Sequence, residues 1–178
     1  MERKDRRGLV MVYTGDGKGK TTAALGLALR AIGHGFKVFM VQFMKGDETG
    51  ELTAVEKYLA GQMKIVQSGS PAFVNPSSPS DEDLTLAARG LGLARDAILG
   101  GEYDLVILDE ANVAMDYGLL ARAEVIKLIK ERPAWVDVVL TGRGAPREIV
   151  DLADLVSEVK EIKHHYRQGI EARAGIEF

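Results

Sequence analysis

The sequence predicts a single α/β domain in which a mainly parallel sheet of about six strands carries helices on both faces. Two observations lead to this prediction. Short apolar runs, typical of strands buried on both faces, alternate along the chain with segments of helical periodicity. In addition, 46% of the 178 residues are hydrophobic, which is enough for one domain with a sizeable core. We expect residues 1–8 to form a basic, solvated arm and residues 9–178 to form the domain.

The first half of the chain begins with an apolar strand. Its expected elements are a strand at 9–13, a helix ending near 31–35, a strand at 36–43, a helix at 51–59 and a strand at 63–67. The glycines on both sides of His34 favour the end of the first helix, since glycine readily follows a last helical turn. Residues 68–80 contain three prolines and five serines, so we expect them to form the longest loop.

In the second half, Ser80 is expected to cap a long helix. The three acids that follow it, residues 81–83, favour the positive end of the helix dipole, and the apolar pattern continues to Leu99. The remaining elements are a strand at 103–108 running into two acids, a helix at 121–131, a strand at 136–141, a helix at 147–153 and a strand at 155–159.

The segment Thr14–Thr22 predicts a phosphate-binding loop between the first strand and the first helix. Its glycines let backbone N–H groups close around a triphosphate where a Cβ would obstruct them. Lys20 supplies a positive charge to the phosphates, and the Thr21 hydroxyl can ligate Mg²⁺. The usual pattern has glycine where Thr14 stands, so the loop is a variant.

Two further groups of polar residues follow predicted strands. Asp109 and Glu110 end an apolar strand, and either carboxylate suits Mg²⁺, which prefers oxygen ligands. Arg143 stands between two glycines, where a guanidinium can contact phosphate bidentately. Lys45 and Arg30 are additional basic candidates. Because the carboxyl ends of parallel strands meet at one edge of a sheet, we expect most of these residues to converge with the phosphate loop.

Composition argues against several classes of protein. The net charge of −3 disfavours a polynucleotide partner, and no apolar run is long enough to span a membrane. The absence of cysteine excludes disulfides and thiolate catalysis and fits a reducing compartment, so we expect a cytoplasmic protein. The three histidines form no catalytic set, and we expect each to have a capping or surface role.

Together these stretches resemble the phosphate-loop type of ATP:corrinoid adenosyltransferases over about residues 10–178. The likeness rests on Gly15–Thr22, Val41–Gly46, Val106–Glu110, Thr141–Gly144, Asp151–Asp154, Glu158 through His164, and Gly169–Phe178. The resemblance implies a phosphate-loop NTPase core of the RecA-like kind. It also implies transfer of the 5′-deoxyadenosyl group of ATP to Co(I) of a corrinoid, with triphosphate leaving and Mg²⁺ or Mn²⁺ as cofactor. ATP would bind in the reversed sense, with C5′ exposed.

The loop and the resemblance together define the candidate site. The nucleotide-binding candidates are Thr14, Gly15, Asp16, Gly17, Lys18, Gly19, Lys20, Thr21, Thr22, Arg30, Lys45 and Arg143. Lys20 and Arg143 are the catalytic candidates, because they would meet the charge of the leaving group. The metal candidates are Thr21, Asp109 and Glu110.

For the corrinoid, the family uses aromatic side chains on a mobile loop. This chain offers Phe73 there, and its tryptophan, Trp135, precedes a strand instead. The N-terminal segment is also shorter than in many members. The resemblance further implies a homodimer and a reduced flavin or flavoprotein as electron donor. It leaves open whether the natural substrate is cobalamin, cobinamide or cobyrinic acid a,c-diamide.

Two other functions use the same loop. A small-molecule kinase or ATPase would release ADP, whereas an adenosyltransferase releases triphosphate. A RecA-like nucleic-acid-binding ATPase would be expected to carry a basic stripe, and the overall acidity disfavours it.

Overall fold

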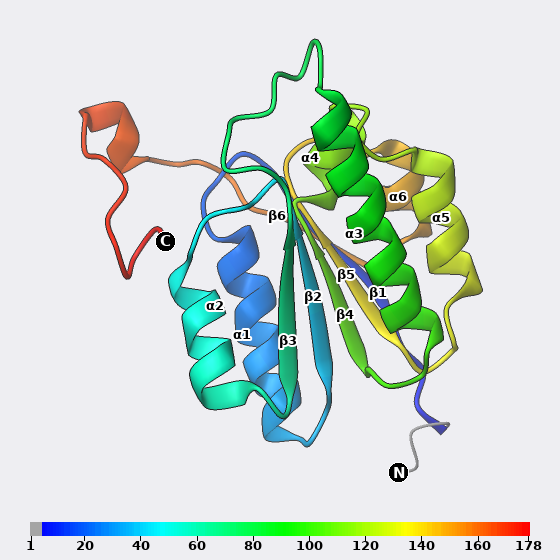
Figure 1. The fold of residues 1–178 in the computed structure, drawn as a ribbon. Helices are drawn as coiled ribbons and strands as arrows, with labels where there is room; N and C mark the ends of the chain where they lie inside the picture. Colours follow the sequence, from blue (N-terminus) through cyan, green and yellow to red (C-terminus); the bar gives the residue numbers. More distant parts are fainter. Residues whose placement is uncertain (1–4) are drawn as a thin grey trace.

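A six-stranded parallel sheet with the strand order β3-β2-β4-β5-β1-β6 forms the centre of the computed structural model, which describes residues 5–178 (Figure 1). The strands are β1 (Val10–Thr14), β2 (Val38–Phe43), β3 (Met63–Ser68), β4 (Leu105–Asp109), β5 (Asp137–Thr141) and β6 (Leu155–Glu158). Strand β5 lies between β1, which leads into the phosphate loop, and β4, which ends at the acids. This is the RecA-like arrangement, so the predicted fold class is confirmed.

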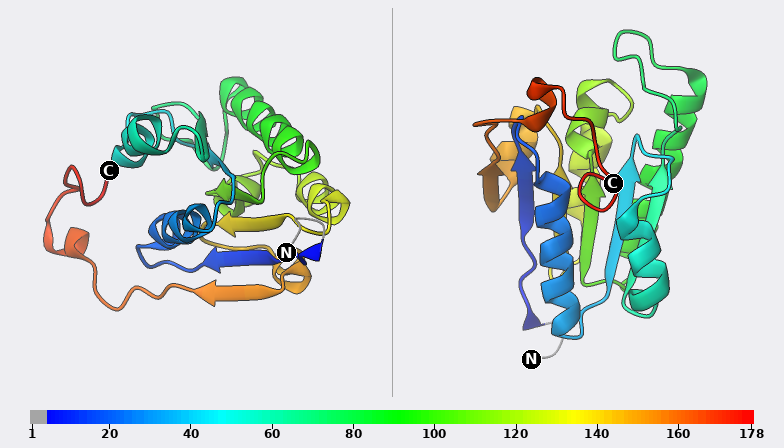
Figure 2. Two further views of the ribbon diagram at one scale, coloured as in Figure 1. Left: turned by 90° about the horizontal axis from the view of Figure 1, so that it is seen from below. Right: turned by 90° about the vertical axis from the view of Figure 1, so that its left-hand side faces the viewer.

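Helices cover both faces of the sheet (Figure 2). They are α1 (Lys20–Gly33), α2 (Gly50–Ala54), a π-helical turn η2 (Val55–Leu59), α3 (Asp81–Leu99), α4 (Ala111–Asp116), α5 (Arg122–Glu131), α6 (Arg147–Leu152) and a 3₁₀ turn η3 (His165–Gln168). Helix α1 packs on one face, and α3, α4, α5 and α6 pack on the other. Within residues 5–178, no helix combines the length and the apolar character needed to cross a lipid bilayer.

The alternation of side chains along each strand produces two cores. In β4, Val106 and Leu108 join the core under α3–α6, whereas Leu105 and Ile107 join the core under α1. All four side chains are at most 2% exposed. Continuous apolar runs are therefore buried on both faces, which is the reason they predict a parallel sheet.

Most predicted elements are present, and three details differ: the helix expected at 51–59, the short helix α4 and the 3₁₀ turn η3. The capping box of α3 forms as expected, since the Asp83 amide donates to Ser80 Oγ at 3.1 Å and the Ser80 amide donates back to Asp83 at 3.0 Å. The helix expected at 51–59 is divided into α2 and the π turn η2. The short helix α4 and the 3₁₀ turn η3 were not predicted, because neither is long enough to show a periodic pattern.

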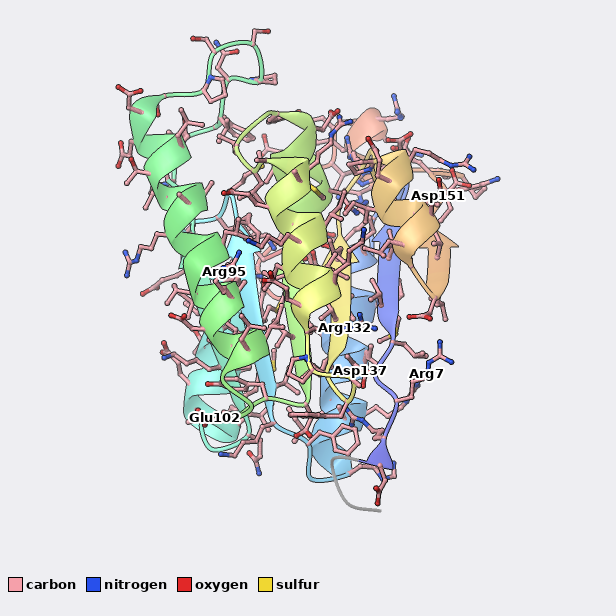
Figure 3. The ribbon with its side chains drawn as sticks, turned by 90° about the vertical axis from the view of Figure 1, so that its right-hand side faces the viewer. Arg7, Arg95, Glu102, Arg132, Asp137 and Asp151 are labelled. Atoms are coloured by element: carbon pink, nitrogen blue, oxygen red, sulfur yellow. The ribbon has the colours of Figure 1, made fainter. Side chains whose placement is uncertain are left out.

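The expected solvated arm is wrong for Arg6. Its guanidinium donates to the backbone oxygens of Trp135 (2.7 Å) and Asp104 (2.9 Å), pairs with Asp137 at 2.9 Å and lies 4.1 Å from the centre of the Phe36 ring. These groups lie at the amino edge of the sheet, and Figure 3 shows Asp137 in the lower half of the molecule. Arg6 therefore fastens the start of the chain to the domain. Residues 1–4 of the expected arm lie outside the described residues.

The chain beyond β6 turns back past the carboxyl ends of the strands toward α2 (Figures 1 and 2). This C-terminal segment, residues 159–178, runs outward from β6 and turns back, so that the end of the chain lies near α2 (Figures 1 and 2). It therefore lies at the carboxyl edge of the strands, where the phosphate loop also lies.

Candidate functional site

The phosphate loop is shaped by its glycines and by the segment that follows β6. Gly15 has a left-handed φ of 95°, and a Cβ there would lie 2.5 Å from the Val159 oxygen. The Gly17 amide donates to that same oxygen at 2.8 Å. Thr14 is the last residue of β1, and its Oγ1 accepts from the Ala145 amide at 3.3 Å. An extended residue needs no glycine, which accounts for the variant first position of the loop.

Lys20 opens α1 directly under the loop. Gly19 precedes it with a φ of 118°, and the buried Lys20 ammonium donates to the Gly17 oxygen at 2.7 Å. Burial lowers the pKa of Lys20, Arg143 lowers it further, and Glu110 opposes both. The Lys20 ammonium is thus held in the loop, beside the space that a bound phosphate chain would occupy.

Asp109 is the hub of the site and is completely buried at the end of β4. Its Oδ1 accepts hydrogen bonds from the hydroxyls of Thr21 (2.8 Å) and Thr141 (2.7 Å). Its Oδ2 accepts from Lys45 at 3.0 Å and from the buried amide of Gln42 at 3.3 Å. Four donors on one carboxylate satisfy its lone pairs, which offsets the cost of burying this group. Asp109 therefore fixes four surrounding side chains.

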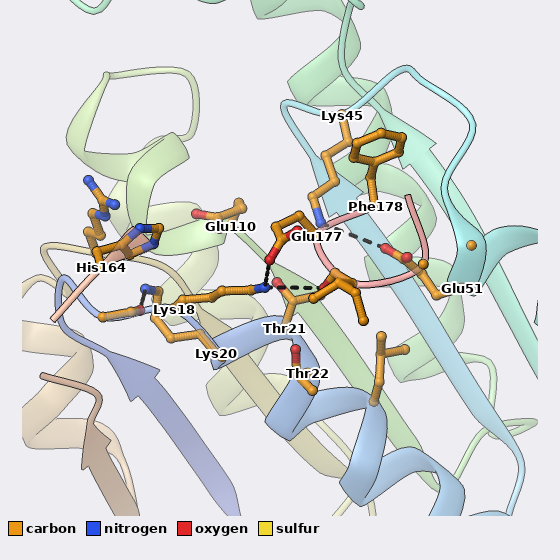
Figure 4. A pocket seen from close by; sticks show the side chains of 17 residues that line it. Lys18, Lys20, Thr21, Thr22, Lys45, Glu51, Glu110, His164, Glu177 and Phe178 are labelled. Carbon is orange, nitrogen blue, oxygen red and sulfur yellow. Dashed lines mark hydrogen bonds and ion pairs between the residues drawn. The ribbon is translucent and has the colours of Figure 1, made fainter. Parts of the chain in front are cut away.

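Glu110, the next residue, differs from Asp109 in position and backbone. It adopts a left-handed φ of 59°, and its amide donates to Thr141 Oγ1 at 2.9 Å. This backbone turn directs the side chain into the cavity instead of the sheet (Figure 4). Burial and the neighbouring Asp109 raise the pKa of Glu110, whereas Lys45 and other cations lower it. A carboxylate in this position is suited to bind a cation in the cavity.

Arg143 lies at the end of β5 between two glycines with positive φ, Gly142 at 126° and Gly144 at 63°. A Cβ on Gly142 would lie 3.0 Å from the Val113 amide nitrogen, so the turn packs closely on α4. The exposed Arg143 side chain borders the same cavity as Lys20 and Glu110.

Two adjoining cavities open at this edge of the sheet. The first, of about 420 Å³, lies over the phosphate loop and is lined by Gly17–Thr22, Leu25, Lys45, Gly50, Glu51, Glu110, Arg143, His164 and Gly175–Phe178. The second, of about 740 Å³, is bordered by the loops at 44–49 and 70–74 and by Tyr117. Lys45, Glu51, Glu110, Glu177 and Phe178 line both cavities. Ligands in the two cavities would therefore be neighbours.

The C-terminal segment forms part of both walls. Glu177 pairs with Lys18 of the phosphate loop at 2.8 Å and accepts from the Arg173 amide at 2.8 Å (Figure 4). Hydrogen bonds from Arg173 and Lys18 lower the pKa of Glu177 to about 2. His164 caps η3 by accepting from the Tyr166 amide and also lines the first cavity. The sequence predicts a capping or surface role for His164, and it does not predict a place in the cavity.

The structure brings most of the candidate residues together. Gly17, Lys18, Gly19, Lys20, Thr21, Thr22, Lys45, Glu110 and Arg143 line the first cavity, with Asp109 hydrogen-bonded beneath it and Phe73 on the second cavity. Thr14 and Gly15 form the start of the loop and line neither cavity, and Asp16 borders a third, charged cavity. Arg30 is set apart: it follows Lys20 by ten residues on α1, about 15 Å along the helix. There it lines a cavity with His34 and Asp137.

Sequence reasoning missed several residues of this site. Gln42 is one of them, although a polar residue within an apolar strand is a signal that it needs a buried partner. Thr141 carries a similar signal, as a hydroxyl at the end of a buried strand. Ile176, Glu177 and Phe178 belong to a segment that carries the family resemblance, but it has neither periodicity nor a recognisable turn pattern that would place it at the cavity.

Comparison with known proteins gives one consistent result. Residues 6–178 match the family model described as ATP:corrinoid adenosyltransferase BtuR/CobO/CobP. Proteins named corrinoid adenosyltransferase are 39% identical over 176 residues in Sinorhizobium sp. and 38% identical over 176 residues in Escherichia coli K12. The alignments cover 98% of this chain and 82% and 88% of those proteins.

Corrinoid adenosyltransferase CobA of Salmonella typhimurium is 38% identical over 178 residues. The alignment covers 98% of this chain and 88% of that protein. Among solved structures, the flagellar accessory protein FlaH of Methanocaldococcus jannaschii is similar, with a TM-score of 0.59 and 13% identity. The match covers 86% of this chain and 71% of FlaH. This last likeness concerns the fold alone.

Proposed function

The chain belongs to the ATP:corrinoid adenosyltransferase family, and from this premise we propose that it transfers the 5′-deoxyadenosyl group of ATP to Co(I) of a corrinoid. The observation that carries the proposal is the pair of adjoining cavities. One is built on a phosphate loop, the other is larger and has Phe73, Val74 and Tyr117 on its walls, and five residues border both. A triphosphate and a flat macrocycle with apolar faces suit these two spaces.

The chemistry requires alignment more than a protein nucleophile. An electron pair of Co(I) attacks C5′ of the ribose, a cobalt–carbon bond forms, and the bond between C5′ and the bridging oxygen breaks. The electrons of that bond remain on the leaving triphosphate, so no proton transfer is needed. Holding the reacting atoms in line can contribute about 7–11 kcal/mol to such a step. Lys20, Arg143 and the loop amides would stabilise the charge of the leaving group.

The residues at the loop fit a magnesium ion. The Thr21 hydroxyl donates its proton to Asp109, so the lone pairs of the Thr21 oxygen remain available to a cation in the cavity. Glu110 borders the same cavity. Within residues 5–178, no three His, Asp or Glu side chains form a metal-binding cluster, which accords with an ion that takes most of its ligands from phosphates and water. We assign Thr21 and Glu110 as its ligands and Asp109 as the residue that positions Thr21. When bound, the ion supplies positive charge to the triphosphate.

Other parts of the assignment extend this proposal. A reduced flavin or flavoprotein would deliver the electron that produces Co(I), and the acceptor is cobalamin, cobinamide or cobyrinic acid a,c-diamide. We also propose a cytoplasmic homodimer, because a chain without cysteine suits a reducing compartment and the family assignment implies a dimer.

The decisive experiment is an anaerobic incubation of the protein with ATP, Mg²⁺ and chemically reduced cobalamin. We expect the visible spectrum to change to that of an alkylcobalt species, with inorganic triphosphate as the second product. Lys20→Ala should lower the rate by roughly 100-fold or more, because it removes a buried charge from the leaving-group site.

Lys64→Ala is the matched control, since Lys64 is exposed on β3 and lies outside both cavities. It should retain the wild-type rate. If no corrinoid yields an alkylcobalt spectrum while ADP accumulates, the protein is a kinase or ATPase and the proposal is wrong. Full activity of Lys20→Ala would overturn the role of the phosphate loop.

A further inference from the structure

Three polar side chains form a row at the carboxyl ends of β3, β2 and β4. Gln42 of β2 is in register with Gln67 of β3 on one side and with Asp109 of β4 on the other. The residues two positions earlier in the same strands contribute to the core under α1: Met40, Ile65 and Ile107. Because side chains two residues apart in a strand point to the same face, this polar row continues that apolar face toward the carboxyl edge.

Gln42 is the centre of the polar row and is completely buried. Its Nε2 donates to Glu51 Oε1 of α2 at 3.0 Å and to Asp109 Oδ2 at 3.3 Å, and its Oε1 accepts from Gln67 Nε2 at 3.3 Å. The opposite orientation of the amide would place its oxygen against two carboxylates, so these partners fix the orientation. Gln42 thus joins two acids from different elements of the chain, while it lines neither substrate cavity.

Lys45 joins the same two acids from the loop after β2. Its ammonium lies 3.0 Å from Asp109 Oδ2 and 4.0 Å from Glu51 Oε1. Lys45 and Glu51 line both the first, nucleotide cavity and the second, acceptor cavity. Since two carboxylates repel each other when a shared donor is lost, the position of Glu51 at this boundary depends on Gln42 as well as on Lys45.

The polar row also reaches the two cavities at its ends. At one end, Gln67 donates to the Asp47 backbone oxygen at 2.8 Å, and Asp47 lines the acceptor cavity. At the other end, Asp109 Oδ1 accepts from the Thr21 hydroxyl at 2.8 Å, and Thr21 lines the nucleotide cavity. Hydrogen bonds therefore run from the loop beside the acceptor cavity to the start of α1, with Gln42 in the middle.

We propose that Gln42 is a positioning residue for the transfer step, which holds Glu51 and Lys45 at the boundary where the nucleotide meets the acceptor. The inference rests on the proposed function, which supplies the two substrates. Each cavity offers its substrate many other contacts, so the affinity for either substrate depends little on this boundary. In-line transfer needs both substrates aligned at once, and a small shift of the boundary therefore affects the rate more than either affinity.

Gln42→Met tests this role, because methionine has a similar length but cannot replace the hydrogen bonds of the amide. In anaerobic assays with ATP, Mg²⁺ and chemically reduced cobalamin, we expect kcat to fall about tenfold or more, since small misalignments have at least this order of effect. The KM values for ATP and for cobalamin should stay within about threefold of wild type. A general loss of structure would raise both KM values instead.

Gln62→Met is the matched control, since Gln62 is exposed and lines neither substrate cavity. It should retain the wild-type kcat and KM. Gln67→Met removes the donor that holds Gln42 from β3, and it should lower kcat about threefold at unchanged KM, the factor that one neutral hydrogen bond contributes. A wild-type kcat in Gln42→Met would overturn the proposal, and so would an equally large increase in both KM values. If Gln42→Met does not fold, a wild-type kcat in Gln67→Met would overturn it.

A crystal structure of Gln42→Met separates this inference from the proposed function. We expect the Glu51 carboxylate and the Lys45 ammonium to be displaced by about 1 Å or more, the order of misplacement that slows such reactions. Unmoved groups would overturn the proposal. If the wild type forms no alkylcobalt while these groups move in the variant, the proposed function fails and the placement of the boundary by Gln42 stands. If the wild type forms alkylcobalt while Gln42→Met keeps the wild-type kcat, the positioning role fails and the proposed function stands.

Discussion

At the scale of single residues, hydrogen bonds and backbone conformation give Asp109, the last residue of β4, and Glu110, which follows it, different environments. Asp109 is saturated by four donors, from α1, β2, β5 and the loop after β2, whereas Glu110 turns away through its left-handed backbone. From the sequence, either acid could contact a metal ion. The separation depends on a backbone conformation and on long-range hydrogen bonds, neither of which a strand pattern encodes.

Thr141 joins the two acids and is the sharpest point at which to test this arrangement. Its hydroxyl donates to Asp109 and accepts from the Glu110 amide, and it is completely buried. Thr141→Val should lower the free energy of unfolding by about 1–3 kcal/mol, because it leaves buried partners unsatisfied. Urea denaturation measures the change.

Thr85→Val is the matched control for that substitution. Thr85 is exposed on α3, and its hydroxyl donates to the Asp81 carbonyl of its own helix. The control should change the free energy of unfolding by no more than about 0.5 kcal/mol. Equal effects of the two valine substitutions would show that the Asp109 hub contributes little.

At the scale of elements, the regular helices and strands were predictable and the segments that finish the site were not. Strand β2 and helix α1 differ from their expected bounds by a few residues, since apolar periodicity and glycine stops are local signals. The loop at 69–79 and residues 159–178 carry no periodicity, and their positions depend on contacts with distant segments. Glu177 is an example, because its partner Lys18 is 159 residues away in the chain.

The loop that carries Phe73 has a separable role in the proposed reaction. Phe73 is fully exposed on the wall of the acceptor cavity, so its ring is free to pack against a corrinoid. We expect Phe73→Ala to slow turnover about tenfold when cobalt must be reduced on the enzyme, since loss of an aromatic contact has this order of effect.

With corrinoid that is reduced chemically beforehand, the same variant should turn over at close to the wild-type rate. Anaerobic assays with a reduced flavin and with a chemical reductant, run side by side, compare the two conditions. Equal loss under both would assign Phe73 to corrinoid binding in general and contradict a role in reduction.

At the scale of the whole molecule, parallel strands bring residues that are distant in sequence to one edge of the sheet. The phosphate loop, Lys45, Asp109, Glu110 and Arg143 follow four different strands and converge as their strand-end positions predict. The opposite edge has its own fastening, because Arg6 joins the start of the chain to Trp135, Asp104 and Asp137. A basic heptapeptide at the start of a chain gives no hint of such a contact.

Arg6→Ala should lower the free energy of unfolding by about 2 kcal/mol at neutral pH, because it leaves the Asp137 carboxylate without its cation. Burial raises the pKa of Asp137, whereas the Leu9 amide and Arg6 lower it. Loss of Arg6 should raise that pKa further. The stability difference should therefore shrink as the pH falls and Asp137 becomes protonated in both proteins.

Urea denaturation at several pH values measures this difference, with Arg7→Ala as the matched control. The Arg7 side chain is 83% exposed and lies 3.4 Å from Asp154. Exposed pairs contribute little, so Arg7→Ala should stay within about 1 kcal/mol of wild type. A pH-independent effect of Arg6→Ala would assign its contribution to its backbone hydrogen bonds and its packing on Phe36 instead of to the ion pair.

The position of Phe178 on the walls of both cavities has a practical consequence for anyone who expresses this protein. Any peptide appended after this residue, such as a purification tag, would begin at the mouth shared by the nucleotide and the acceptor. We expect a preparation carrying such an extension to lose activity even when its catalytic residues are intact. Tags are better placed before Arg6, which contacts Trp135 at the amino edge of the sheet, away from both cavities.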